Sequence, residues 1–245
     1  MASRHSLPVI RLVGISPHEA LPVVELVERA SREVAVRGFD LVVVRGEENL
    51  RRVLGEYWTP ESADFYALHI ALERPTVIVR LDVSRDLLTA SIYHELGHAK
   101  LHGHRRYYEI SVPRNDLPLG GAAPKVLYLL SIAVKDYEVS SYLAERGLIH
   151  TQRPLVREML PLDTLPWEEL RRDRLASALA LAAQLKPIFF SLPLLGEGLV
   201  RDLPGAPEEF LEWAIETAGK LGEDTIQNVG LVARSFSRFL DYFIR

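Results

Sequence analysis

The amino-acid sequence predicts an α+β fold whose last part is entirely helical. Two observations lead to this prediction: β-branched runs alternate with capped helical segments up to about residue 150, and only helical periodicity follows Leu155. The chain has 245 residues, of which 48% are hydrophobic, enough for one large domain or a domain with an appendage. We expect a first domain at residues 1–150 and an all-α C-terminal region at residues 151–245 that packs on it as a bundle.

The first domain is expected to hold a small mixed or antiparallel sheet. Residues 16–19, Ser-Pro-His-Glu, are a capping box with proline at the first helical position, so a helix should begin there and run to about Arg37. The apolar runs at 63–72 and 76–83 flank Glu73-Arg74-Pro75, which predicts a β-hairpin, although residues 65–70 also fit a helix. The other elements expected here are strands at 9–13 and 39–45 and a short helix at 47–55.

Helices dominate the rest of the chain. Ser84 can cap a helix that runs to about His102, and Gly103 can end it. A loop rich in proline and glycine at 111–124 precedes a second long helix, expected from Lys125 to Arg146. Further helical segments are expected near 155–162, 165–185, 207–221 and 225–244. The last has an amphipathic face that the two preceding segments should cover; left open to water, it would bind a second copy or a protein partner.

The most specific motif is His94-Glu95-Leu96-Gly97-His98. Residues four apart lie on one face of a helix, so His94 and His98 can direct imidazole nitrogens at one metal ion. Glu95 lies one step round the helix, where it can reach a water molecule on that ion. This H-E-x-x-H pattern is typical of zinc-dependent hydrolases in which the glutamate is the general base. The alternatives are a surface helix with two unrelated histidines, or a metal site without activity.

The sequence leaves the third zinc ligand open, and a catalytic zinc normally has three protein ligands. His104 has the spacing of the third histidine of metzincins, but Leu101 occupies the position where that family has a glycine. His102 lies on the same helical face as His98, yet it is too far along the helix axis to share the ion.

Two carboxylates on the expected helix at 125–146 are better candidates. At 100° per residue, Asp136 falls into an apolar stripe, and a buried carboxylate is costly unless it is paired or binds a metal. Glu138 falls nearer Lys135, toward the polar side. We favour Asp136 as the ligand with Glu138 close behind, and the other of the two would hydrogen-bond a ligating histidine. The alternative is that Asp136 pairs with a basic residue in the core and Glu138 is solvated.

A resemblance to a known family adds to these observations. The segment Thr76–His102, with a strand, a serine-capped helix and the pattern H-E-L-G-H-A-x-L-H, resembles the minimal gluzincin-type metallopeptidase domain of the ImmA/IrrE family. The resemblance covers about residues 60–147, and the helical C-terminal region has no such resemblance. It implies zinc-dependent cleavage of peptide bonds, often in a regulatory protein.

The same resemblance implies roles for individual residues. His94 and His98 match the histidine ligands, and Glu95 matches the general base. The acidic third ligand of the family comes from a downstream helix, and it maps to Asp136 or to Glu138. In the family this acid is commonly followed by small and aromatic residues, and the residues after Asp136 depart from that pattern.

Composition excludes several other classes of protein. The net charge is −4 and Lys/Arg clusters are lacking, which argues against a nucleic-acid partner. Cysteine is absent, so disulfides, thiolate zinc ligands and cysteine nucleophiles are excluded together. The N-terminus lacks a signal-like apolar core, and we find no apolar run near the ~18–20 residues that cross a bilayer. We therefore expect a cytoplasmic protein without a membrane partner.

The expected function is that of a soluble zinc metallopeptidase that acts on a peptide or protein substrate. The hairpin at 63–83 can offer a strand edge to an extended peptide. The residue that stabilises the oxyanion is not identified among Tyr107, Tyr108, Tyr142 and His104. The alternative is a partner-binding or sensor protein on a retained metallopeptidase scaffold, in which the C-terminal helices do the work. An intact Glu95 argues against this alternative, because a structural zinc has no need of a base.

Overall fold

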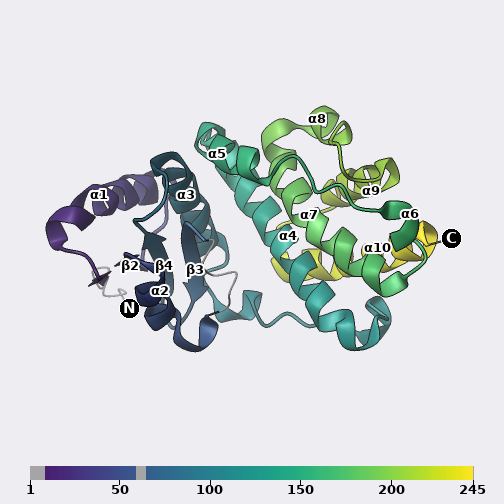
Figure 1. The fold of residues 1–245 in the computed structure, drawn as a ribbon, viewed down its shortest axis with the longest axis horizontal. Helices are drawn as coiled ribbons and strands as arrows, with labels where there is room; N and C mark the ends of the chain where they lie inside the picture. Colours follow the sequence, from purple (N-terminus) through teal and green to yellow (C-terminus); the bar gives the residue numbers. More distant parts are fainter. Residues whose placement is uncertain (1–8, 59–64, 245) are drawn as a thin grey trace. The chain divides into compact units, whose positions relative to one another are not determined.

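The computed structural model describes residues 9–58 and 65–244 (Figure 1). The chain forms two compact units, which are Met1–Tyr108 with Arg146–Leu155, and Glu109–Glu145 with Val156–Arg245. The fold is mixed α+β, as predicted. This division differs from the one expected at residue 150, because the long helix that follows the 111–124 loop packs with the C-terminal helices.

The first unit contains a four-stranded mixed sheet with the order β1-β2-β4-β3. Strand β2 pairs in parallel with β1 and with β4, and β3 pairs antiparallel with β4 at the edge of the sheet. The expected hairpin is therefore present, and its first strand lies at the edge of the sheet. The strands are β1 (Ile10–Val13), β2 (Asp40–Val44), β3 (Ala67–Ala71) and β4 (Pro75–Arg80).

Alternating side chains place different helices on the two faces of this sheet. Val42, Val44 and Ile78 form one apolar cluster with Leu50 and Leu54 of α2 (Glu47–Leu54). On the other face, helix α3 (Arg85–Leu101) packs on β3 and β4, and helix α1 (Pro17–Glu33) packs on α3. His69 of β3 is in register with Val77 and belongs to this second face. The short 3₁₀ turns are η1 (Gly55–Tyr57) and η3 (Arg105–Tyr107), and α5 (Ile149–Met159) begins in this unit.

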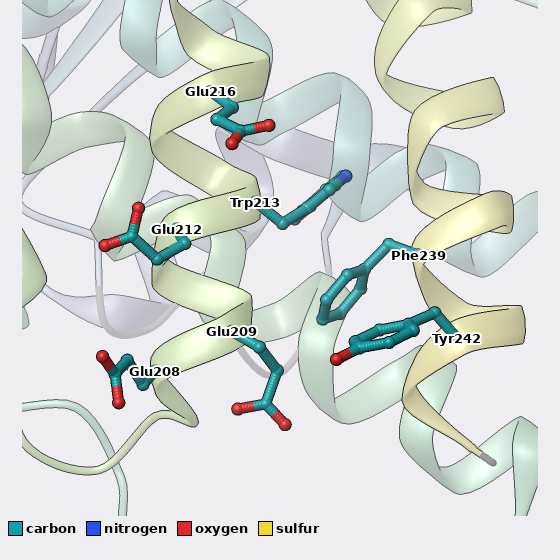
Figure 2. Close-up of a pocket in the computed structure, with 7 residues that line it drawn as sticks. All are labelled: Glu208, Glu209, Glu212, Trp213, Glu216, Phe239 and Tyr242. Atoms are coloured by element: carbon teal, nitrogen blue, oxygen red, sulfur yellow. The ribbon is translucent and has the colours of Figure 1, made fainter.

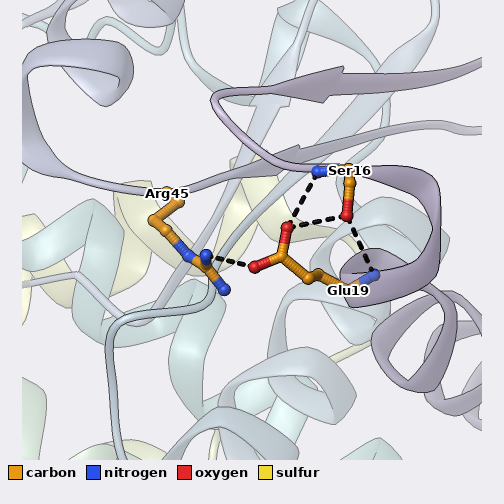
Figure 3. A network of polar contacts seen from close by, with 3 residues as sticks. All are labelled: Ser16, Glu19 and Arg45. Carbon is orange, nitrogen blue, oxygen red and sulfur yellow. Dashed lines mark hydrogen bonds and ion pairs between the residues drawn. The ribbon is translucent and has the colours of Figure 1, made fainter.

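The predicted capping box is present at the start of α1. The Ser16 hydroxyl accepts the Glu19 backbone N–H, and the Ser16 backbone N–H donates to the Glu19 carboxylate at 3.1 Å (Figure 3). The same carboxylate pairs with Arg45 at 2.5 Å. The Ser16 hydroxyl also donates a hydrogen bond to the Glu19 carboxylate. This bond, followed by the hydrogen bond from Arg45, lowers the pKa of Glu19 from 4.5 to about 2. Helix α1 ends at Glu33, four residues before the predicted end. Ala35 there adopts a left-handed conformation with φ of 54°, which a continuing helix does not allow.

The second unit is a bundle built around α4 (Ala123–Glu145) and α7 (Arg174–Leu195). Helix α10 (Thr225–Phe243) packs on α4, α7 and α9 (Glu208–Ala218), so its amphipathic face is covered, as predicted. Its aromatic residues Phe236, Phe239 and Phe243 are buried. The remaining elements are η4 (Arg114–Asp116), η5 (Gly120–Ala122), α6 (Trp167–Leu170) and α8 (Glu197–Arg201).

Helix α7 departs most from the prediction. It continues through Pro187 and Pro193 to Leu195, whereas the pattern suggested an end near residue 185. The helix persists because it lies in the core of the bundle, where burial of its side chains outweighs the hydrogen bonds that proline removes. By length and composition it could cross a membrane, which corrects the expectation that no segment could; however, 56% of its apolar window is buried inside the protein.

A shallow pocket lies between α9 and α10 in the second unit (Figure 2). Trp213 from α9 and Phe239 and Tyr242 from α10 point toward one another, and four glutamates line the α9 side. Glu209 pairs with Arg171, and Glu212 pairs with Arg201 at 2.9 Å. Part of the acidic charge at this pocket is therefore already balanced within the unit.

Candidate metal centre

Helix α3 brings the two histidines of the motif together. His94 and His98 lie one turn apart, and their side chains are buried, with 6% and 9% of each residue exposed. Their Nε2 atoms are 3.1 Å apart. Two lone pairs at this distance repel each other unless a proton or a cation lies between them. The pair is therefore arranged either to share a proton in a hydrogen bond or to bind a cation.

The chemistry of these side chains fits a zinc ion. Two nitrogens bound to one tetrahedral zinc at ~2.0–2.1 Å lie ~3.3 Å apart, close to the spacing of the two Nε2 atoms. Zinc accepts imidazole and carboxylate ligands, which are the groups that a chain without cysteine can supply. A divalent ion could therefore replace the proton that the two histidines would otherwise share.

His102 contacts the other nitrogen of His98. The two Nδ1 atoms are 3.1 Å apart, and His102 is fully buried with its ring edge-on to Tyr107. A histidine that binds a metal through Nε2 carries its proton on Nδ1 and donates it to a neighbour. His102 can be this acceptor. His102 thus lies beside the Nδ1 side of His98, which agrees with the expectation that His102 is not itself a ligand.

Glu95 is held by the edge strand of the sheet. The backbone N–H of His69 in β3 donates to the Oε2 atom of Glu95 at 2.8 Å. Along β3, residues whose backbone groups bond to β4 alternate with residues whose backbone groups point to the open edge of the sheet. The Arg80 N–H donates to the Tyr66 carbonyl, so Tyr66 belongs to the first set and His69, three residues on, to the second. His69 therefore directs its N–H away from β4 and toward Glu95. This bond fixes one carboxylate oxygen of the predicted general base.

His69 is the residue at this site that sequence reasoning missed. Its ring lies parallel to that of His98, with 6.4 Å between the centroids, and its Nδ1 atom is 2.9 Å from the Tyr108 hydroxyl. The signal that could have found it is a histidine between apolar residues in the strand Ala67–Ala71, on the buried side of the alternation. Its proximity to Glu95 depends on long-range strand pairing, which a local pattern does not contain.

In the second unit, Asp136 of α4 is buried, with 3% of the residue exposed. The Nζ atom of Lys186 on α7 is 3.7 Å from its Oδ2 atom, an ion pair longer than a hydrogen bond. Lys135, which the periodicity placed on the polar side, is buried instead. Burial lowers the pKa of Lys135 to about 8, and the carboxylates of Asp136 and Glu138 oppose this shift.

Glu138 is engaged with helix α10 of the same unit. Its carboxylate accepts the Thr225 hydroxyl at 2.8 Å and the Asn228 side-chain amide at 2.7 Å. Glu138 is therefore not simply solvated, whereas the contact between Asp136 and Lys186 is the pairing with a basic residue that the same alternative predicted. These bonds give Glu138 a structural partner, and the choice between Asp136 and Glu138 as the third ligand stays a prediction.

Within the described part of the chain, His94, His98 and Asp136 are buried side chains of the types that could hold a metal ion. The two histidines belong to the first unit and the aspartate to the second, so the role of Asp136 as their third ligand stays a prediction. His104 is exposed and its Nδ1 atom accepts the Arg106 backbone N–H at 3.1 Å, so that nitrogen already has a partner. Tyr142 lies on α4 in the second unit, partly buried.

The chain matches no protein-family model, no curated protein and no solved structure. The resemblance of Thr76–His102 to the ImmA/IrrE family therefore stays a prediction from the motif. The case for a function accordingly rests on the residues of the site.

Proposed function

We propose that the protein is a zinc-dependent metallopeptidase, with His94, His98 and Asp136 as the metal ligands and Glu95 as the general base. One observation carries most of this proposal: the Nε2 atoms of His94 and His98 are 3.1 Å apart on α3, while the neighbouring Glu95 is hydrogen-bonded to an edge strand. A surface helix with two unrelated histidines would not bury both rings and bring their Nε2 atoms within 3.1 Å of each other.

The proposed reaction divides the work between the metal and the chain. A bound zinc ion would polarise the substrate carbonyl and lower the pKa of water. Glu95 accepts a proton from the attacking water as its oxygen bonds to the carbonyl carbon. The carbon–nitrogen bond then breaks, and Glu95 returns the proton to the leaving amine. The N–H of His69 keeps the carboxylate in place between these two transfers.

Strand β3 supplies a surface for an extended peptide. It is the last strand in the sheet order, and Ala67 and Ala71 have the same outward parity as His69. The outward backbone groups of Ala67 and Ala71 can pair with a substrate strand through main-chain hydrogen bonds, while the N–H of His69 stays on Glu95.

Metal analysis and one substitution test the proposal. Protein purified without chelator should contain about one zinc per chain. Glu95→Gln should retain the zinc and the fold, while cleavage of a mixed peptide library, read by mass spectrometry, should fall ~10²–10⁴-fold. A chain that binds no zinc at micromolar concentration, or an equal rate for wild type and Glu95→Gln on a cleaved peptide, would refute the proposal.

A partner-binding protein on a metallopeptidase scaffold is the second candidate function. The observation that favours it is the pocket between α9 and α10, where Tyr242 is 65% exposed beside Trp213 and several glutamates (Figure 2). Exposed aromatic residues are common at protein interfaces. In this case zinc would be retained, and Glu95→Gln would change no measurable property of the protein.

A further inference from the structure

His69 connects the predicted general base to a tyrosine hydroxyl. Its backbone N–H donates to Glu95 at 2.8 Å, and its side-chain Nδ1 atom lies 2.9 Å from the Oη atom of Tyr108. The rings of His69 and Tyr108 have centroids 5.9 Å apart. A single residue of the edge strand thus fixes two polar groups beside the histidine pair of α3.

The two members of this pair differ in exposure. His69 is buried, with 6% of the residue exposed, whereas 43% of Tyr108 is exposed. A buried imidazole has few orientations open to it, so it can hold the hydroxyl of an exposed tyrosine at one place. When Nδ1 of His69 carries the proton, it donates to the Tyr108 oxygen, and the hydroxyl proton of Tyr108 is then directed to another acceptor.

A peptide paired with the outer edge of β3 would pass this hydroxyl. The backbone N–H of His69 points to the outer edge of β3, while its buried ring lies parallel to that of the candidate ligand His98, with 6.4 Å between the centroids. Hydrogen-bond donors aimed at the position where a carbonyl oxygen becomes negative are a main source of rate enhancement in acyl transfer. The sequence alone left this donor unidentified among several tyrosines and a histidine.

We propose that Tyr108 donates a hydrogen bond to the carbonyl oxygen of the scissile peptide bond, and that His69 positions the Tyr108 hydroxyl for this task. This inference rests on the proposed peptidase function. Tyr108 would touch the substrate, so it is the catalytic residue of the pair, while His69 acts through it.

The neighbouring tyrosine provides a matched comparison. The Tyr107 hydroxyl accepts a hydrogen bond from Arg106 at 2.6 Å, and the Tyr107 ring packs edge-on against His102. Tyr107 therefore packs on His102, and its hydroxyl is engaged by Arg106. Removal of its hydroxyl should leave the proposed carbonyl site unchanged.

The test measures binding of acetohydroxamate to the zinc-loaded full-length protein by titration calorimetry, together with zinc affinity. The carbonyl oxygen of this small chelator stands in for that of the substrate. Tyr108→Phe should weaken acetohydroxamate about tenfold, as expected for loss of one hydrogen bond to an anion, and should leave zinc affinity unchanged. Tyr107→Phe should change neither quantity.

Variants of His69 test the positioning role. His69→Leu should weaken acetohydroxamate as much as Tyr108→Phe does, and the double variant should be no weaker, because the two residues act as one unit. His69→Asn should restore most of the binding, since the Asn amide nitrogen can replace Nδ1 as the donor. Tyr108→Phe remains decisive even if His69→Leu does not fold, because Tyr108 is at the surface.

Wild-type binding with no loss in Tyr108→Phe, or an equal loss in Tyr107→Phe, would overturn this inference and leave the proposed function standing. Loss of zinc in a folded His69→Leu would overturn the positioning role of His69, because the residue would then support the metal ligands. A protein without zinc, or with zinc that acetohydroxamate cannot reach, would overturn both the inference and the proposed function.

Discussion

Helices α3 and α4 carry the candidate ligands in two different ways. In α3, His94, Glu95 and His98 fall within five positions; His94 and His98 contact each other, and Glu95 accepts a hydrogen bond from β3 of the same unit. In α4, Asp136 and Glu138 are two residues apart, yet one pairs with Lys186 of α7 and the other with α10. The spacing of residues along one helix is enough to place the two histidines of α3 together. The partner of a carboxylate on the core helix α4 depends instead on which other helix packs against it.

The same contrast extends to the support around each helix. The polar groups beside the H-E-x-x-H motif include His69, His102 and Tyr108, and imidazole can pass a proton or hold a metal. The polar groups near α4 are a lysine, a threonine and an asparagine that fix one helix to another. From this difference we infer that substitutions in α3 will act mainly on the metal, and that most substitutions in the second unit will act on stability.

The largest expected effect is release of the metal. His98→Ala removes one of the two close Nε2 atoms, so zinc affinity should fall by more than the ~10–100-fold that loss of an outer partner costs. Asp136→Ala should have a similar effect if this carboxylate is the third ligand. Zinc bound at equilibrium against a chromophoric chelator measures both.

Glu138→Ala is the matched control on α4. It should retain zinc and lower the free energy of unfolding, because Thr225 and Asn228 lose their acceptor. Zinc loss in Glu138→Ala together with normal affinity in Asp136→Ala would reverse the assignment of the third ligand.

The second largest effect is expected in the core of the bundle. Phe236 on α10 is fully buried, and its ring lies edge-on to Trp213 with centroids 5.7 Å apart. Phe236→Ala should therefore reduce the free energy of unfolding by ~3–5 kcal/mol, measured by urea denaturation. Tyr242→Ala on the same helix should change it by less than ~1 kcal/mol, since that side chain is largely exposed. Equal losses would mean that the α10 face is not the one that holds the bundle together.

A smaller effect is expected at the histidines that follow the motif. His102→Ala removes the neighbour of His98 Nδ1, so zinc affinity should fall ~10–100-fold while the ion still binds. His104→Ala should leave zinc affinity unchanged, because His104 is exposed and caps a 3₁₀ turn. A larger loss in His104→Ala than in His102→Ala would instead support the metzincin-like alternative.

The comparison of the two helices also explains what the sequence could predict. The hairpin, the capping box at Ser16 and the helix of the motif depend on neighbours within a few residues, and all three are present. Ser84 begins α3 as predicted, although its side chain makes no capping hydrogen bond there. Local chemistry thus determined where these elements begin.

Features set by distant residues were not predictable in the same way. The contact between His69 and Glu95 joins residues 26 apart and depends on which strand lies at the sheet edge. Helix α7 passes Pro187 because the surrounding bundle buries it, and Lys135 is buried against the polar pattern of its own helix. In each case tertiary packing outweighs a local preference.

The smallest expected effect concerns the surface network at Glu19 (Figure 3). Its pKa is lowered from 4.5 to about 2 by hydrogen bonds from Ser16 and Arg45, so its carboxylate stabilises the folded state at any pH above 4.5. That contribution should be lost as the pH falls from 4.5 through 2, since the unfolded chain takes up the proton first. Glu19→Gln should therefore be less stable than wild type at pH 6, and the difference should shrink toward pH 2. Urea denaturation at several pH values measures this, and 1 M salt should also reduce the difference because the Arg45 pair is exposed. A difference that is independent of pH would show that the cap acts through its geometry rather than its charge.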